Sequence, residues 1–319
     1  MGMESAQPPL PLDLERRLRR VALMAALAVI AFLALAVLGD ATALRDGLHR
    51  LGPGQWLALL GLSLVNYALR FLRWHGYLRA LGARVAIGRD LLIYVAGFAF
   101  TVTPGKAGEA VRSVYLRASG VAWSPGLAAL AVERVLDLTA MVMLAALAFR
   151  VFADQAWPAL LLVAGVAAGL YGVTRPGVAS WLVGWLPDRG RWLEGKAGTL
   201  RVLDQARLLL APQRLLGGLG LGVAAWAAEA WGFYLLLGWL GVEAEGLRAI
   251  GIYAVSMLAG ALSFLPGGLG GAEAAMVALL VAGGAVVGTA VLATAICRVV
   301  TLWLAVGLGI GAVLWLGKC

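Results

Sequence analysis

Eight charged side chains stand inside apolar stretches of the sequence, where an ionisable group costs about 2.5–3.5 kcal/mol to insert into a bilayer. Such groups are expected to pair with one another or to line a wet cavity. An arginine fork suits a phosphate oxygen, and neighbouring desolvated carboxylates suit proton exchange. These charged residues are Glu109, Arg112, Glu133, Arg134, Asp137, Glu229, Glu273 and Arg298.

Spacing gathers part of this set into a mixed-charge cluster. Arg134 and Asp137 are three residues apart and Glu133 and Asp137 four, so all three project from one broad side of a helix. We expect three arginines to bind a phosphate and three carboxylates to tune charge or carry protons: Arg112, Arg134 and Arg298, and Glu109, Glu133 and Asp137. The alternative is a salt-bridged anchor that holds no substrate.

Two short apolar stretches lead into this charged region. Residues 91–102 and 250–265 run directly into Pro-Gly turns, and at 1.5 Å per residue they reach about 18 and 24 Å. Neither length crosses the ~30 Å hydrocarbon core. Each therefore predicts a re-entrant helical hairpin, which is permitted only where protein or a polar cavity surrounds the broken backbone. We expect the turns to act as hinges through Pro104, Gly105, Gly108, Pro266, Gly267, Gly268 and Gly270.

The two hairpins belong to an internal repeat. Adding 164 to the residue number carries Glu109 to Glu273 and Arg134 to Arg298. With the first hairpin entering from the cytoplasm and the second from outside, the halves are related by inversion, as in many transporters with a substrate site near the midplane. The alternative is that the turns only reverse the chain and that each glutamate only neutralises its arginine.

Composition sets the fold class. Of 319 residues, 62 % are apolar and 13 % are charged, against a usual 45–50 % and roughly 25 %. This excludes a soluble enzyme, a disordered chain and a disulfide scaffold. The sequence predicts an all-α polytopic membrane protein with about six full spans and two re-entrant hairpins as an inverted repeat; the spans are at 21–38, 55–69, 126–149, 156–173, 215–240 and 284–316.

The distribution of the basic residues predicts how the chain is oriented in the membrane. With a cytoplasmic N-terminal segment at 1–20, 20 of the 26 Lys and Arg lie on the cytoplasmic side and four lie outside, as the positive-inside rule predicts. Nucleic acid is therefore not an expected partner. Residues 21–316 form one membrane domain with repeat halves at about 55–150 and 215–316. The basic connection 175–214 lies in the interface against anionic lipids, or is a solvated linker.

Other polar residues receive simpler interpretations. Asn66, Arg70 and Arg73, with Trp74, are typical of snorkelling arginines and an aromatic belt at the end of a span. The two Cys and two His have no metal-ligand spacing. Since neither a nucleophile with its partners nor a Walker loop is present, we expect no catalytic residue, no metal and no cofactor.

Four motifs resemble a known family: Arg73-Trp74, the PGKAGE turn from Pro104, the ERVLD run from Glu133 and the PGGLGGAE turn from Pro266. Over roughly 21–316 the chain is similar to the lysylphosphatidylglycerol synthase transmembrane, or flippase-like, family. The resemblance implies an all-helical bacterial inner-membrane protein that moves lipids or assists their modification. Bifunctional members carry a C-terminal aminoacyl-transferase domain. We expect none here, because the sequence stops soon after its last apolar stretch, and synthase activity is not transferred.

The function expected from these features is translocation or presentation of an anionic lipid across the inner membrane: a phospholipid, a polyprenyl-phosphate-linked lipid or a hopanoid type. The N-terminus is expected in the cytoplasm. One alternative is a non-transporting accessory that docks a lipid-modifying enzyme on the connection 175–214. A third hypothesis is an intramembrane enzyme that uses paired carboxylates on a lipid phosphate.

Overall fold

A computed structural model describes residues 49–103, 108–152, 191–263 and 265–317, with isolated positions between 161 and 184. The expected span at 21–38 lies outside the described residues, as do the hinge residues Pro104 and Gly105 and most of 156–173. Within the described part every regular element is helical. The all-helical class is thereby confirmed.

Three long helices are apolar enough to cross a membrane. They are α2 (Pro53–Ala80), α9 (Pro212–Trp239) and the continuous run of α12 (Val287–Arg298), a π-helical turn (Val299–Trp303) and α13 (Leu304–Leu316). α2 and α9 both begin with proline, whose fixed φ favours the first helical position and whose missing N–H needs no partner there. The exact number of spans stays a prediction.

A fourth helix of similar length carries charge at its centre. α5 (Trp123–Phe152) has 30 residues, which is about 45 Å of helix. It contains Glu133 and Asp137, which are buried, and Arg134, which is partly exposed. Outside the bundle core, α8 (Arg191–Leu209), the described helix of the connection 175–214, packs against α5.

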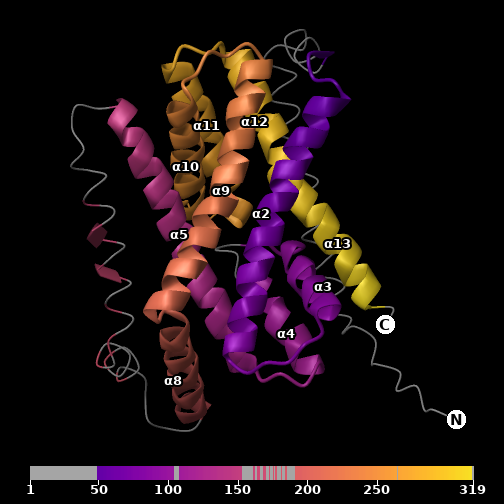
Figure 1. Cartoon of the computed structure of the whole chain (residues 1–319), viewed down its shortest axis with the longest axis vertical. Helices are drawn as coiled ribbons and strands as arrows, with labels where there is room; N and C mark the ends of the chain where they lie inside the picture. Colours follow the sequence, from indigo (N-terminus) through magenta and orange to yellow (C-terminus); the bar gives the residue numbers. More distant parts are fainter. Residues whose placement is uncertain are drawn as a thin grey trace, which may run out of the picture.

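Two short helical hairpins enter the bundle from opposite ends (Figure 1). The first, hairpin 1, consists of α3 (Ile87–Phe98) and α4 (Val111–Ala118). Hairpin 2 consists of α10 (Gly246–Leu262) and α11 (Gly271–Ala282), joined through the 3₁₀ turn Pro266–Gly268. The longest arm, α10, has 17 residues, about 26 Å, so neither hairpin crosses the bilayer core.

The tips of the hairpins meet near the middle of the molecule. Gly267 and Gly268 have φ of 65° and 68°, a left-handed conformation that only glycine adopts without strain. A side chain on Gly267 would lie 3.3 Å from the Cα of Val102, which belongs to the tip of hairpin 1. The turn glycines of hairpin 2 are therefore required both by the backbone and by the neighbouring tip.

The repeat register holds at the level of whole helices. Adding 164 to the bounds of α5 gives 287–316, the bounds of the run from α12 to α13. In each half this long helix leaves its own hairpin and packs against the other: α5 packs along α10, and α13 along α3. This exchange is the relation expected of an inverted repeat.

Candidate functional site

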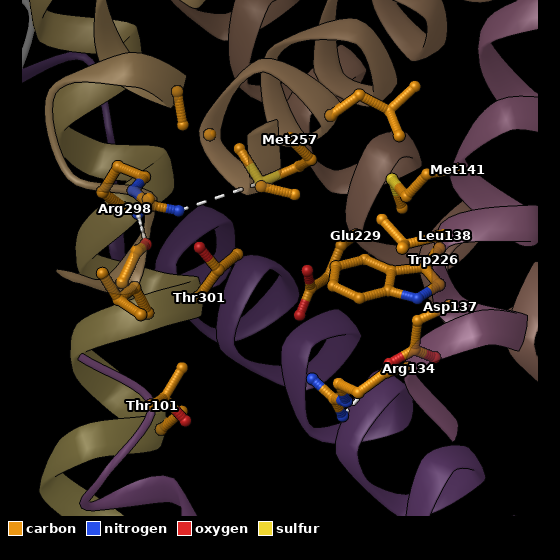
Figure 2. Close-up of a pocket in the computed structure, with 18 of the residues that line it drawn as sticks. Thr101, Arg134, Asp137, Leu138, Met141, Trp226, Glu229, Met257, Arg298 and Thr301 are labelled. Atoms are coloured by element: carbon orange, nitrogen blue, oxygen red, sulfur yellow. Dashed lines mark hydrogen bonds and ion pairs between the residues drawn. The ribbon is translucent and has the colours of Figure 1, made fainter. Parts of the chain in front are cut away.

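A cavity of about 360 Å³ lies where the hairpin tips meet, and we call it the central cavity. Figure 2 shows Arg134 and Asp137 on one side of it and Arg298 on the other, with Glu229 between them. Its charged lining residues are Arg70, Glu109, Arg134, Asp137, Glu229 and Arg298. Three of the predicted phosphate ligands and proton carriers, Glu109, Arg134 and Asp137, therefore share one wall.

These three residues belong to a closed ring of alternating charges, which also contains the predicted Arg112 and Glu133 and, in addition, Arg73. Each carboxylate bridges two arginines of the ring, and Arg70 adds a seventh charge on Asp137 at 3.0 Å. The remaining ion pairs are Arg134–Glu109 at 3.5 Å, Glu109–Arg112 at 2.9 Å, Arg112–Glu133 at 3.1 Å, Glu133–Arg73 at 3.9 Å, Arg73–Asp137 at 2.5 Å and Asp137–Arg134 at 3.2 Å. Four arginines against three carboxylates leave a formal charge of +1 in this charge ring.

Arg112 and Glu133 are fully buried, and neither lines the central cavity. The guanidinium of Arg112 lies 4.2 Å from the ring centroid of Tyr94 and 5.1 Å from that of Trp74, in cation–π contact with both. Glycine at position 97 leaves room for it, because a Cβ there would overlap the Arg112 side chain. Arg112 and Glu133 therefore lie behind the wall of the central cavity, and the ligand roles predicted for them stay predictions.

The interpretation of Arg70 and Arg73 as snorkelling residues is wrong. Both side chains are buried and ion-paired to Asp137, because the face of α2 that carries them packs against α9 and α5. Asn66, one turn earlier, donates its side-chain amide to the carbonyl of Ala225 at 2.9 Å. The signal that could have predicted this burial was the spacing of Asn66, Arg70 and Arg73, which places all three on one face of the helix.

Arg134 is the most exposed of the charge-ring residues that line the central cavity. Its side chain is 24 % exposed, against 8 % or less for its ring partners. Both of its ion pairs use Nη2, and neither has hydrogen-bond geometry. Nε and Nη2 of Arg134 are thus buried without a hydrogen-bond acceptor in the described part of the chain.

On the opposite side, Arg298 holds the turn of hairpin 2. Its Nε donates to Glu273 at 2.6 Å and its Nη2 to the carbonyl of Gly267 at 3.0 Å. Glu273 in turn accepts the backbone N–H of Gly270 at 2.7 Å. The repeat-related pairs Glu109 with Arg134 and Glu273 with Arg298 both form. Within the part of the chain that the structure describes, only the first pair belongs to a larger network of ion pairs.

A π-helical turn follows Arg298 directly. π-turns interrupt the regular ladder and frequently mark functional positions. Thr301 and Leu302 of this turn line the central cavity, and the Tyr67 hydroxyl donates to the Thr301 carbonyl. The local shift in helix register therefore exposes a backbone acceptor to α2 and turns new side chains toward the cavity.

Two residues of α9 complete the lining. The Tyr253 hydroxyl donates to Glu229 at 2.5 Å, and the guanidinium of Arg70 lies 5.1 Å from the ring centroid of Trp226. The buried indole N–H of Trp226 has no hydrogen-bond acceptor in the described part of the chain. Trp226, Tyr253 and Tyr67 were not predicted as site residues, since aromatic residues are common in apolar spans.

The mouth of the central cavity is apolar. Leu138 on α5, Leu262 on α10 and Leu265 line it and are also exposed on the outer surface, Leu262 by 73 %. On a membrane protein such surface faces lipid tails. Among the described residues no group of three His, Cys, Asp or Glu gathers for a metal ion, and the absence of a cofactor stays a prediction.

Comparisons with known proteins agree with the resemblance. The family model described as "Lysylphosphatidylglycerol synthase TM region" matches residues 22–309. A "UPF0104 membrane protein" of Methanothermobacter thermautotrophicus is 22 % identical over 323 aligned positions, which cover 93 % of this chain and 96 % of that protein. The similarity therefore runs through both hairpins and both charge clusters.

Proposed function

The chain belongs to the lysylphosphatidylglycerol synthase transmembrane family, a family of membrane proteins, and we propose that it is a flippase-like transporter of lipids with an anionic headgroup. The headgroup binds in the central cavity while its hydrocarbon tails stay in the bilayer. In this proposal the chain lies in the inner, or plasma, membrane of a bacterium with its N-terminus in the cytoplasm. Synthase activity is not part of the proposal.

The observation that carries the proposal is the accessible arginine of the buried charge ring. The charge ring has a formal charge of +1, and Arg134 presents it to the central cavity. A unit anion about 4 Å from such a charge gains about 4 kcal/mol at an effective dielectric of 20. The charged groups that line the central cavity balance at three arginines and three carboxylates, so the gain comes from closeness to Arg134 and not from a net charge of the cavity.

Arg298 provides a second binding position for the headgroup within the central cavity. Arg134 and Arg298 stand on opposite sides of the same cavity (Figure 2), and each is tied to one hairpin, Arg134 through Glu109 and Arg298 through Glu273 and Gly267. A phosphate that binds Arg134 competes with Glu109 and loosens hairpin 1. Passage to Arg298 competes with the carbonyl of Gly267 and loosens hairpin 2.

The apolar mouth supports a lipid rather than a soluble anion. Leu138, Leu262 and Leu265 offer a path along which tails remain in lipid while the charged group enters. Phospholipids, polyprenyl-phosphate-linked lipids and hopanoid-type lipids with an anionic group all meet this requirement. Their common feature is a phosphate or similar anion close to a hydrocarbon chain.

The proposal is tested by lipid movement in liposomes that contain the purified chain. We expect fluorescent phosphatidylglycerol to cross between leaflets, and Arg134→Ala to slow it at least tenfold, with partial rescue by Arg134→Lys. Glu109→Gln should also alter the rate. Arg79→Ala serves as the control, because Arg79 is an exposed arginine outside the central cavity. Rates that are unchanged in both Arg134→Ala and Glu109→Gln would refute the site.

The accessory alternative gives a different result in the same preparation. It predicts no lipid movement by the pure chain and loss of a co-purifying lipid-modifying enzyme when the charges of 175–214 are reversed. An intramembrane enzyme instead predicts product formation from purified chain and lipid alone. Three observations thus distinguish the hypotheses: lipid movement by the pure chain, co-purification of a lipid-modifying enzyme, and formation of a product from lipid.

A further inference from the structure

A second cavity lies at the end of the molecule where hairpin 1 enters, away from the central cavity. It has a volume of about 890 Å³ and lies between the corner that joins α4 to α5 and the helix α8. We call it the outer cavity. Its walls come from segments about 75 residues apart in the sequence, so only the tertiary fold brings its polar groups together.

The charge of the outer cavity is not compensated. Arg117 from α4 and Arg201 from α8 line it, and no carboxylate does so among the described lining residues. The central cavity differs in this respect, because three carboxylates there balance three arginines. Two guanidinium groups on separate elements match the several oxygens of a phosphate, which Arg binds with its planar fork.

Neighbouring groups fit this ligand. The guanidinium of Arg117 lies 5.5 Å from the ring centroid of Trp123, and this contact limits where the arginine points. The hydroxyl groups of Ser124 and Thr199 line the same space. On α8, Gly198 leaves the floor open, since a Cβ there would meet no atom within 4 Å.

The position of the outer cavity and the apolar residues in its walls favour the phosphate of a lipid over free phosphate. Trp123 is 38 % exposed, as in the aromatic belts that lie at headgroup level. Val121, Leu127 and Val202 add apolar wall beside the arginines. A free phosphate gains nothing from such a wall, whereas the first carbons of an acyl chain do.

We propose that the outer cavity binds the phosphate of an anionic phospholipid from the adjoining leaflet, bridging Arg117 of hairpin 1 to Arg201 of α8. This lipid is bound in place and is distinct from the headgroup that enters the central cavity. It fastens the outer arm of hairpin 1 to α8. The site does not depend on transport.

The test uses photoreactive phosphatidylglycerol with the full chain in detergent, followed by mapping of the labelled peptides. We expect label in 121–127 and 195–202, displaced by phosphatidylglycerol but not by phosphatidylcholine. Each basic residue near an anionic surface contributes about fivefold in affinity, so Arg117→Gln with Arg201→Gln should lower labelling about 25-fold. The matched control is Arg79→Gln with Arg84→Gln, which removes two exposed charges that do not line the outer cavity.

A second pair of variants changes shape without charge. Gly198→Leu fills the outer cavity and should abolish labelling, whereas Gly217→Leu, at an exposed glycine of α9 that does not line it, should not. Arg134→Gln should leave this label unchanged, so failure of the central site is distinguishable. Labelling that survives the Arg117 and Arg201 variant, or falls equally in the control pair, overturns the proposal. Competition by inorganic phosphate as strong as by phosphatidylglycerol overturns the assignment to a lipid.

Discussion

Asp137 is the most heavily shared carboxylate of the charge ring, and its removal tests the network directly. Its two oxygens pair with Arg73 at 2.5 Å, Arg70 at 3.0 Å and Arg134 at 3.2 Å, and its side chain is buried. Asp137→Asn keeps the shape but raises the formal charge of the ring from +1 to +2. Arg70 then loses the carboxylate with which it pairs.

The expected cost follows from burial. Removing one partner of a buried ion pair leaves an uncompensated charge and costs about 3–5 kcal/mol. Arg70→Gln should cost less, because Asp137 keeps two other arginines. The double variant restores a ring charge of +1, so we expect it to be more stable than the sum of the single effects by about 1–3 kcal/mol.

The assay is the free energy of unfolding of the full chain in mixed micelles, with Asp204→Asn as the matched control. Asp204 pairs with Arg207 at 2.8 Å, but its side chain is 67 % exposed. An exposed pair contributes about 0–1 kcal/mol, so this control should change little. If Asp137→Asn costs no more than Asp204→Asn, or if the double variant shows strictly additive losses, the charge ring is not the stabilising unit described above.

Three further substitutions test other parts of the site. Gly267→Ala places a side chain at φ 65° and should cost about 1–3 kcal/mol of stability, whereas Gly217→Ala should not destabilise; equal melting temperatures would refute the requirement for glycine in the turn. Tyr253→Phe removes the donor to Glu229 and should cost about 1–3 kcal/mol, measured by unfolding; an unchanged stability would mean that this bond contributes nothing. Arg112→Lys keeps the charge but loses the fork and the ring contacts, so unfolding should occur at lower denaturant and transport should slow; a fully stable variant would show that charge alone suffices.

The sequence predicted those features that depend on local pattern. Short apolar stretches before Pro-Gly turns predicted both hairpins, because helix length in residues converts directly to a distance. The register of 164 predicted the pairs Glu109 with Arg134 and Glu273 with Arg298, because equal spacing in two copies of one fold places the same groups together. Both pairs form.

The features that could not be predicted from the sequence depend on which face of a helix packs against which neighbouring helix. Arg70 and Arg73 have the spacing of snorkelling residues, and only the packing of α2 on α9 and α5 turns them inward. Arg112 belongs to the predicted cluster, yet its short helix buries it beneath Tyr94. Sequence spacing identified the charges but not which of them reach the central cavity.

Equilibrium binding of a fluorescent phosphatidylglycerol to the purified chain measures whether the central cavity is an anion site with Arg134 as its accessible ligand. A charged hydrogen bond contributes about 1.5–3 kcal/mol, so Arg134→Gln should weaken binding by about 10- to 150-fold, with Arg134→Lys intermediate. Glu109→Gln frees Arg134 from a competitor and should leave binding as tight or tighter. Equal affinity in Arg134→Gln and the unaltered chain, or a loss in Glu109→Gln as large as that in Arg134→Gln, would contradict the account.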